Sequence, residues 1–308
     1  MNSDRSKAEA PAGLAVRGQA GAAKFSDYLE LTKPRLSLLS VLTALVGYLA
    51  ARTPHGAGRL MCVLIGTSLA AGGVAALNQW MESDTDARMR RTADRPIPTG
   101  KVATGSAFVL GWLMCVASLM LAIAKVNLLS ALFTLLTITA YLGWYTPAKR
   151  WSRWSTEIGA IAGALPPLIG WTAAEDRVSS LGWILFGILF FWQIPHFMAV
   201  AWTHRADYAA VRFPMRPVRD ASGRSTALCA LVAAVLLAAV SVLPSFLGFA
   251  DAWYGAASAC TGAWIIARAI AFLRADGRDL AARKLFLASI AYLPLQLGAL
   301  VADRLARF

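Results

Sequence analysis

The sequence predicts an all-α, polytopic membrane protein in which about nine transmembrane helices form one bundle around a central cavity, with a cytoplasmic N-terminus. Two observations favour this fold class. Of the 308 residues, 57% are hydrophobic and only 15% are charged, whereas a soluble domain averages about 25% charged residues. The apolar residues also gather into stretches of roughly 20 residues, the length that a helix needs to cross the hydrocarbon core of a bilayer.

The predicted spans follow one another with short connections. They cover roughly residues 36–52, 60–82, 103–124, 127–146, 155–173, 181–202, 226–248, 251–273 and 284–303. The turn between the third and fourth spans is short, and Pro166-Pro167 breaks the fifth, either as a packing kink or as the wall of a pocket. After the second span, Pro96, Pro98 and Gly100 end the helix and fix a turn.

The basic residues orient the chain. With the N-terminus inside, 24 of the 30 Lys and Arg residues fall on the inner side, as the positive-inside rule expects. This asymmetry accounts for most of the net charge of +13, so nucleic acid is not an expected partner. Residues 1–24 are polar and contain Asp4 and Glu9, so we expect a disordered cytoplasmic tail followed by one intramembrane domain over 25–308.

An acidic ladder marks the end of the second span. Asn78, Glu82 and Asp86 are spaced by four residues, which places the three side chains on nearly one helix face over roughly 12 Å. Oxygen ligands of this kind suit Mg²⁺, which fills its remaining positions with phosphate oxygens and water. Asp84 points off this face. The alternative is a solvated helix end that forms salt bridges with the arginines that follow.

Basic and polar groups on the same inner side extend this pattern. Arg91 and Arg95 follow the ladder, and Lys149 and Arg150 lie in the next inner connection, where they are expected to bind diphosphate oxygens. His196 lies inside the sixth span, on one face with Gln193. It is interpreted either as a helix–helix hydrogen-bonding residue or as part of a polar pocket lining.

Together these segments resemble the UbiA-type intramembrane prenyltransferase superfamily, and within it the protoheme IX farnesyltransferases, or haem O synthases. The resemblance runs from about residue 26 to residue 300. It rests on Asn78-Gln79-Trp80-Met81-Glu82 through Asp86 to Gly100, on Tyr145-Thr146 with Lys149-Arg150, on Gly159 to Trp171, and on Trp192-Gln193 with Pro195-His196-Phe197, Arg205 and Asp207-Tyr208. The first segment is shared across the superfamily, whereas the Trp-Gln-x-Pro-His-Phe segment is similar to the haem-directed branch.

The resemblance implies transfer of a farnesyl group from farnesyl diphosphate to a vinyl group of haem B, with water addition, to give haem O. It implies Mg²⁺ as cofactor, the cell inner membrane as location, active-site loops on the cytoplasmic side, and downstream haem-modifying enzymes or cytochrome oxidase assembly proteins as partners. The expected metal ligands are Asn78, Glu82 and Asp86, with His196 as a further catalytic residue. The candidates for the acceptor side are Trp192, Gln193, His196, Asp207 and Tyr208.

This chain departs from the superfamily pattern at two places, and other functions compete. Glu82 stands where Asp is usual, and the second inner loop lacks an Asp-x-x-x-Asp motif, with His196 and Asp207 in its place. A quinone- or chlorophyll-type acceptor would use the same diphosphate site. A transporter of anionic lipids or metabolites would need charges near the membrane midplane. A haem-carrying electron-transfer protein would need paired histidines within spans, and the chain has only three histidines.

Overall fold

The structure is a computed structural model that describes residues 23–51 and 56–307. These residues form helices and connections without a β-strand, which confirms the all-α class. Apart from its last two residues, the expected disordered tail at 1–24 lies outside the described part of the chain.

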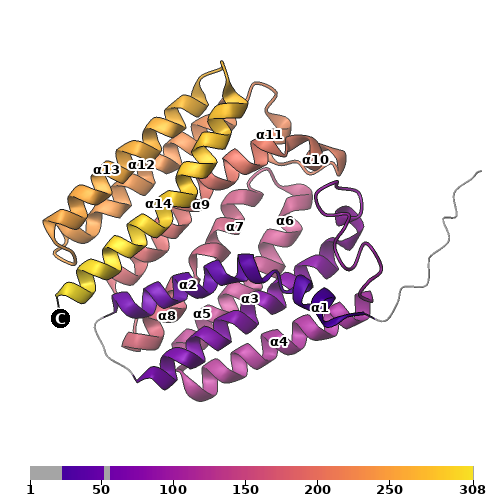
Figure 1. Cartoon of the computed structure of the whole chain (residues 1–308), viewed down its shortest axis with the longest axis horizontal. Helices are drawn as coiled ribbons and strands as arrows, with labels where there is room; N and C mark the ends of the chain where they lie inside the picture. Colours follow the sequence, from indigo (N-terminus) through magenta and orange to yellow (C-terminus); the bar gives the residue numbers. More distant parts are fainter. Residues whose placement is uncertain (1–22, 52–55, 308) are drawn as a thin grey trace, which may run out of the picture.

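Fourteen α-helices and one π-helix make up the described chain (Figure 1). In chain order they are α1 (Phe25–Leu31), α2 (Pro34–Ala50), α3 (Ala57–Asp86), α4 (Thr104–Lys125), α5 (Leu128–Thr139), the π-helix η1 (Ala140–Tyr145), α6 (Thr146–Trp151), α7 (Ser155–Ala164), α8 (Pro166–Glu175), α9 (Ser180–Thr203), α10 (Arg205–Ala210), α11 (Arg216–Arg219), α12 (Arg224–Phe246), α13 (Ala252–Leu273) and α14 (Arg278–Ala306).

Seven helical segments among the described residues are long and apolar enough to cross a membrane. They are α3, α4, the continuous segment Leu128–Trp151, α9, α12, α13 and α14. The apolar helix α2 is shorter, with 17 residues. In place of the predicted fifth span, α7 and α8 follow each other with 10 residues each, because Pro166 cannot continue the hydrogen bonding of α7. The count of nine spans and the orientation of the N-terminus stay predictions.

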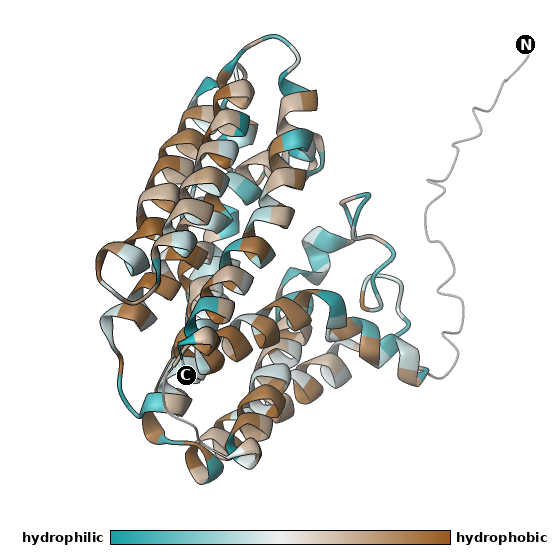
Figure 2. Cartoon of the chain, turned by 60° about the vertical axis from the view of Figure 1, so that its left-hand side comes forward, coloured by the Kyte–Doolittle hydropathy of each residue, from teal (hydrophilic) through white to brown (hydrophobic). Residues whose placement is uncertain are grey.

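The helices form two neighbouring groups, with α7 between them (Figure 1). In one group α3 packs on α4 and α2, and α2 packs on α8; in the other α12 packs on α13 and α9, and α14 on α13 and α9. Helix α7 contacts both η1 and α9, and α14 also contacts α2. Hydrophobic residues run along the helices, and hydrophilic residues gather in the connections (Figure 2).

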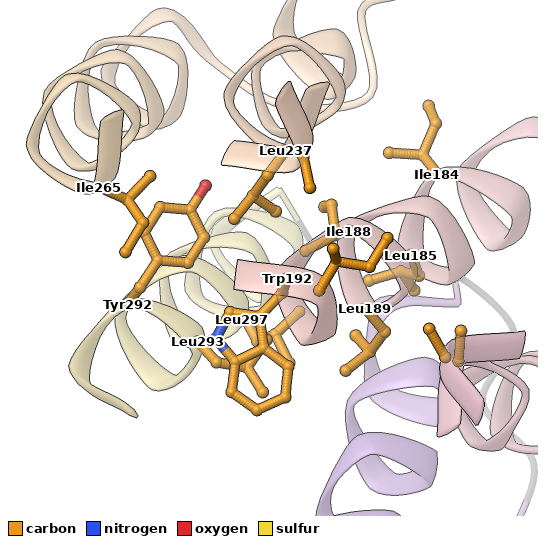
Figure 3. Packing of buried hydrophobic residues seen from close by; sticks show 14 of the residues in the cluster. Ile184, Leu185, Ile188, Leu189, Trp192, Leu237, Ile265, Tyr292, Leu293 and Leu297 are labelled. Carbon is orange, nitrogen blue, oxygen red and sulfur yellow. The ribbon is translucent and has the colours of Figure 1, made fainter. Parts of the chain in front are cut away.

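The largest buried core surrounds α9. Ile188 of this helix lies near Leu237 of α12 and Tyr292 of α14, and Leu185 and Leu189 extend the same cluster on the other side of α9 (Figure 3). In water, burial of each large apolar side chain would stabilise this arrangement by about 1.5–3 kcal/mol. Inside a bilayer, dense packing between the helices stabilises it instead.

Small residues bring two helices of the other group together. An ideal Cβ added at Gly170 of α8 would lie 1.8 Å from the carbonyl oxygen of Ala44 in α2, and one added at Gly47 would lie 2.0 Å from the carbonyl oxygen of Pro167. Backbones approach this closely only where no side chain intervenes. This contact fixes α2, and with it the residue that precedes the helix, Lys33.

The connection after α3 and the one after α10 pack on each other. Met89, which follows α3, is buried with Val211, Phe213 and Met215, which lie between α10 and α11. The two connections therefore form one cluster, and this cluster holds the end of α3 beside α10.

Candidate active site

The acidic ladder lies on the last turns of α3 and faces inward. Asn78, Glu82 and Asp86 are 2%, 5% and 0% exposed, whereas Asp84 is on the surface, with 55% of its side chain exposed. The spacing of four thus separates the ladder from its acidic neighbour, as the sequence predicts. A fully solvated helix end would not bury two carboxylates.

Each member of the ladder faces a cation from a different segment. Asp86 Oδ2 accepts from Arg95 of the α3–α4 connection at 2.5 Å. Glu82 accepts from Lys149 of α6, with Nζ 2.8 Å from Oε1 and 3.0 Å from Oε2. Asn78 Oδ1 accepts from Lys33 Nζ at 3.5 Å. Three basic side chains therefore surround two carboxylates in a mostly buried site.

Lys33 is a site residue that the sequence reasoning missed. It lies between α1 and α2 with a left-handed φ of 45°, a conformation that is costly for a residue with a side chain. Burial, together with the neighbouring charges of Arg95 and Lys149, lowers the pKa of Lys33 to about 7. The sequence shows a lysine directly before Pro34, at the start of a predicted span. Where the side chain of this lysine points depends on the packing of α2.

The junction of the π-helix η1 with α6 supports the ladder from the side. Asn78 Nδ2 donates to Thr146 Oγ1 at 3.1 Å, and the Thr146 hydroxyl donates to the carbonyl of Tyr141 at 2.9 Å. The ammonium of Lys149 lies 4.5 Å from the centre of the Tyr145 ring, a cation–π contact. π-Helical turns are frequent at functional sites, and here η1 leads directly into α6, whose Thr146 and Lys149 contact the ladder on α3.

The ladder fits a hard divalent cation. Asp86 Oδ1 is buried without a hydrogen-bond partner among the described residues, and a buried carboxylate oxygen of this kind is costly unless a ligand satisfies it. No cluster of three His, Cys, Asp or Glu side chains suited to a metal occurs in the described ranges. The donor set is therefore two carboxylates and one amide oxygen, which leaves positions for phosphate and water, as Mg²⁺ prefers.

The two remaining candidates for diphosphate binding lie farther out. Arg150 pairs with Asp84 at 2.7 Å and donates to the carbonyl of Met81 at 2.9 Å, and this pair is largely exposed. Arg91 is exposed and lies 3.4 Å from the hydroxyl of Tyr208. The structure thus brings Arg95 and Lys149 to the ladder, but it places Arg150 on the other side of α3.

The candidates for the acceptor side separate into two places. Trp192 stacks on His196 with ring centres 4.9 Å apart, and both residues hydrogen-bond to Ser289 of α14. Gln193 instead donates to the carbonyl oxygens of Ala160 and Leu189, so its amide group ties α9 to α7.

Asp207 and Tyr208 lie on α10, away from this pair. Asp207 is 3.8 Å from His204, and the Tyr208 ring stacks on Phe213. Tyr208 also lies beneath the guanidinium of Arg91, 5.8 Å from its ring centre. The structure therefore places Tyr208 with the basic residues that follow α3, and not with His196.

Comparison with known proteins identifies the family. The model of the UbiA prenyltransferase family matches residues 40–290. A protoheme IX farnesyltransferase of Opitutus terrae is 69% identical over 283 residues, covering 92% of this chain and 96% of the relative. A protoheme IX farnesyltransferase of Solibacter usitatus is 38% identical over 289 residues, covering 90% of this chain and 98% of the relative.

Solved structures show the same fold at low identity. A structure described as digeranylgeranylglyceryl phosphate synthase has a TM-score of 0.78 at 16% identity and covers 91% of this chain and 98% of its own. A UbiA homologue of Archaeoglobus fulgidus bound to GPP and Mg²⁺ has a TM-score of 0.64 at 16% identity and covers 89% of this chain and 99% of its own. The chain belongs to the UbiA prenyltransferase family and, within it, to the protoheme IX farnesyltransferase branch; it is a prenyltransferase.

Proposed function

We propose that this membrane protein transfers the farnesyl group of farnesyl diphosphate to a vinyl group of haem B, with addition of water, to give haem O. The observation that carries the proposal is the buried ladder of Asn78, Glu82 and Asp86, whose members each face a cation. The name of the relative that is 69% identical supports haem as the acceptor and farnesyl as the group transferred.

Mg²⁺ would be held by the ladder, through Asn78 Oδ1, a Glu82 oxygen and the unpartnered Asp86 Oδ1. When bound, it would neutralise the diphosphate and make it a better leaving group. The description of the related Archaeoglobus fulgidus structure names both Mg²⁺ and a prenyl diphosphate, which supports the assignment.

The basic residues bind and orient the diphosphate. Lys149 and Arg95 already lie at the ladder, and Lys33 adds a third basic side chain beside Asn78. Hydrogen bonds from charged donors to phosphate oxygens are about twice as strong as neutral ones. Arg91 lies in the connection between α3 and α4, and Arg150 lies beside the exposed Asp84. Both would attract the diphosphate through the longer-range electrostatic field of the protein.

The transfer proceeds by ionisation of the allylic substrate. The C–O bond of farnesyl diphosphate breaks, and its electron pair leaves with the diphosphate. The π-electrons of the haem vinyl group then form the new C–C bond, and a water molecule captures the resulting cation and loses a proton. The face of Tyr145, beside Lys149, would stabilise the allylic cation, and Trp192 and His196 would line the acceptor side.

A prenyltransferase with a quinone- or chlorophyll-type acceptor is the alternative, because it would use the same diphosphate site. Only the segment around His196 distinguishes the two in this chain. The proposed location is the cell inner membrane, with the ladder and its loops facing the cytoplasm. A haem-modifying enzyme or a cytochrome oxidase assembly protein would receive the product.

A reconstitution with competing acceptors tests the proposal. The purified protein in lipid nanodiscs is supplied with MgCl₂, farnesyl diphosphate and, separately, haem B or a 4-hydroxybenzoate-type quinone precursor. Mass spectrometry should find haem O from haem B, with ¹⁸O incorporated when the reaction runs in H₂¹⁸O. Prenylation of the quinone precursor in preference to haem B would contradict the proposal.

A further inference from the structure

Ser289 joins two side chains of α9 to α14. Its carbonyl oxygen accepts from Trp192 Nε1 at 2.7 Å, and its hydroxyl lies 2.9 Å from His196 Nδ1. Ser289 itself is fully buried. It is 97 and 93 residues away from Trp192 and His196 in the sequence, so no local sequence pattern predicts the contact.

The hydrogen-bond chain determines which nitrogen of His196 carries the proton. The Ser289 hydroxyl has one hydrogen, and it donates this hydrogen to the carbonyl of Phe286 at 2.7 Å. Towards His196 the hydroxyl can therefore only accept, so Nδ1 is protonated. In the neutral imidazole, Nε2 then carries the free lone pair.

Aromatic rings hold the imidazole in one plane. Trp192 stacks on it with ring centres 4.9 Å apart and an interplanar angle of 26°. Phe197 lies against its edge at 5.1 Å, and Phe286 lies at 5.0 Å. An imidazolium is costly in such a setting, so the neutral form is favoured.

The second nitrogen remains available. Nε2 of His196 has no hydrogen-bond partner among the described residues. It is also absent from the buried side-chain atoms of these residues that lack a partner, so it is accessible. A histidine that binds a metal usually has a neutral, oriented imidazole. One of its nitrogens is fixed by a hydrogen bond, and the other has an accessible lone pair. A histidine that served only to join helices would have its hydrogen-bonding capacity satisfied within the protein.

We propose that Nε2 of His196 is an axial ligand of the iron of the substrate haem, and that Ser289 is the positioning residue that fixes its tautomer. This inference rests on the proposed function, in which haem B is the acceptor. Histidine is a common axial ligand of haem iron, and one iron–nitrogen bond would fix the centre of the porphyrin. The porphyrin could then hold a vinyl group at a fixed position relative to the allylic carbon of farnesyl diphosphate.

Spectroscopy of haem binding tests the proposal without catalysis. Ferric haem B is titrated into the protein in nanodiscs without farnesyl diphosphate, and the Soret band and the EPR spectrum are recorded. The native protein should give a histidine-ligated spectrum. His196→Ala should lose this spectrum, and added imidazole should restore it. Since the chain has only three histidines, His204→Ala, at an exposed position, serves as the matched control and should retain the native spectrum.

Ser289 is tested by graded substitutions. Ser289→Ala should weaken haem binding by about 10–100-fold, the usual effect of removing a partner that orients a metal ligand, and should broaden the EPR signal. Ser289→Thr, which keeps the hydroxyl, should restore both. Ser118→Ala removes another fully buried serine, whose hydroxyl binds the carbonyl of Gly66, and it should leave the spectrum unchanged; thermal melting confirms that each variant is folded.

The outcomes separate this inference from the proposed function. If the folded His196→Ala variant gives the native spectrum, the ligand assignment is overturned, even where the native protein makes haem O. If the histidine-ligated spectrum depends on His196 but no haem O forms, the proposed function fails and the haem site stands. An unchanged EPR signal and affinity in Ser289→Ala would remove the positioning role of Ser289.

Discussion

Asp86→Asn tests the ladder, because it removes one charge and almost no volume. Asp86 is fully buried, with Oδ2 on Arg95 and Oδ1 without a partner. The substitution replaces one carboxylate oxygen by an amide nitrogen, which cannot ligate a cation. We expect kcat/KM for prenyl transfer to fall by more than about 100-fold, which corresponds to about 2.7 kcal/mol of transition-state stabilisation.

The matched control lies two residues away. Asp84→Asn removes the same charge from the same helix, but Asp84 is exposed and pairs with Arg150. An exposed ion pair contributes about 0–1 kcal/mol, so its substitution should change kcat/KM less than about fivefold.

Folding is separated from catalysis by a second substitution. Asp86→Asn leaves Arg95 without its carboxylate, and breaking a buried ion pair can cost about 3–5 kcal/mol. Asp86→Glu keeps the charge and the pair but moves the carboxylate by one methylene. It should melt near the native temperature and still lose activity, because Mg²⁺ requires close to ideal ligand positions. The assay is product formation at saturating Mg²⁺ per amount of monodisperse protein, and equal losses in Asp84→Asn and Asp86→Asn would refute the ladder.

Three further predictions follow from other parts of the structure. Lys149→Met should weaken farnesyl diphosphate binding at least tenfold and leave haem binding unchanged, while Arg150→Met should have a smaller effect; isothermal titration with each ligand separately checks this, and a haem-selective defect in Lys149→Met would reverse the assignment. Gly170→Ala should lower the thermal midpoint by several degrees, because the new Cβ would lie 1.8 Å from a backbone oxygen, whereas Gly143→Ala, which meets nothing within 4 Å, should not; equal melting curves would contradict the close helix contact. Burial raises the pKa of Asp220, but hydrogen bonds from the start of α12 outweigh it and hold the pKa below its ordinary value of 3.8. Its carboxylate therefore stabilises the fold above about pH 4, and this stability is lost as the pH falls through the folded-state pKa. Asp220→Ala should lower the melting temperature at pH 7, and the deficit should shrink as the pH is lowered progressively below 3.8; a deficit that does not change with pH would show that ionisation is irrelevant.

Local patterns in the sequence predicted the parts of the site that lie on one helix. The ladder could be identified because the spacing of four residues itself defines a helix face, and the structure buries Asn78, Glu82 and Asp86 while leaving Asp84 outside. Lys149 and Arg95 were identified as basic residues on the same side of the membrane, and both reach the ladder.

The remaining features depend on contacts between distant segments. Lys33 reaches Asn78 because α2 packs closely on α8 and because its own backbone is left-handed. Arg150 directly follows Lys149 in a helix, so the two side chains point about 100° apart, and Arg150 meets Asp84 instead of the ladder. Ser289 reaches His196 across two helices, and no spacing within α9 or α14 specifies this pair.

A structure with bound ligands shows directly whether the ladder holds the metal ion and the diphosphate. The protein is solved with Mn²⁺ in place of Mg²⁺ and a thiolo analogue of farnesyl diphosphate, so that anomalous scattering locates the metal. We expect a metal ion ligated by Asn78, Glu82 and Asp86, with the diphosphate in contact with Lys149 and Arg95. Metal and diphosphate bound elsewhere, with the ladder still paired only to its own cations, would contradict it.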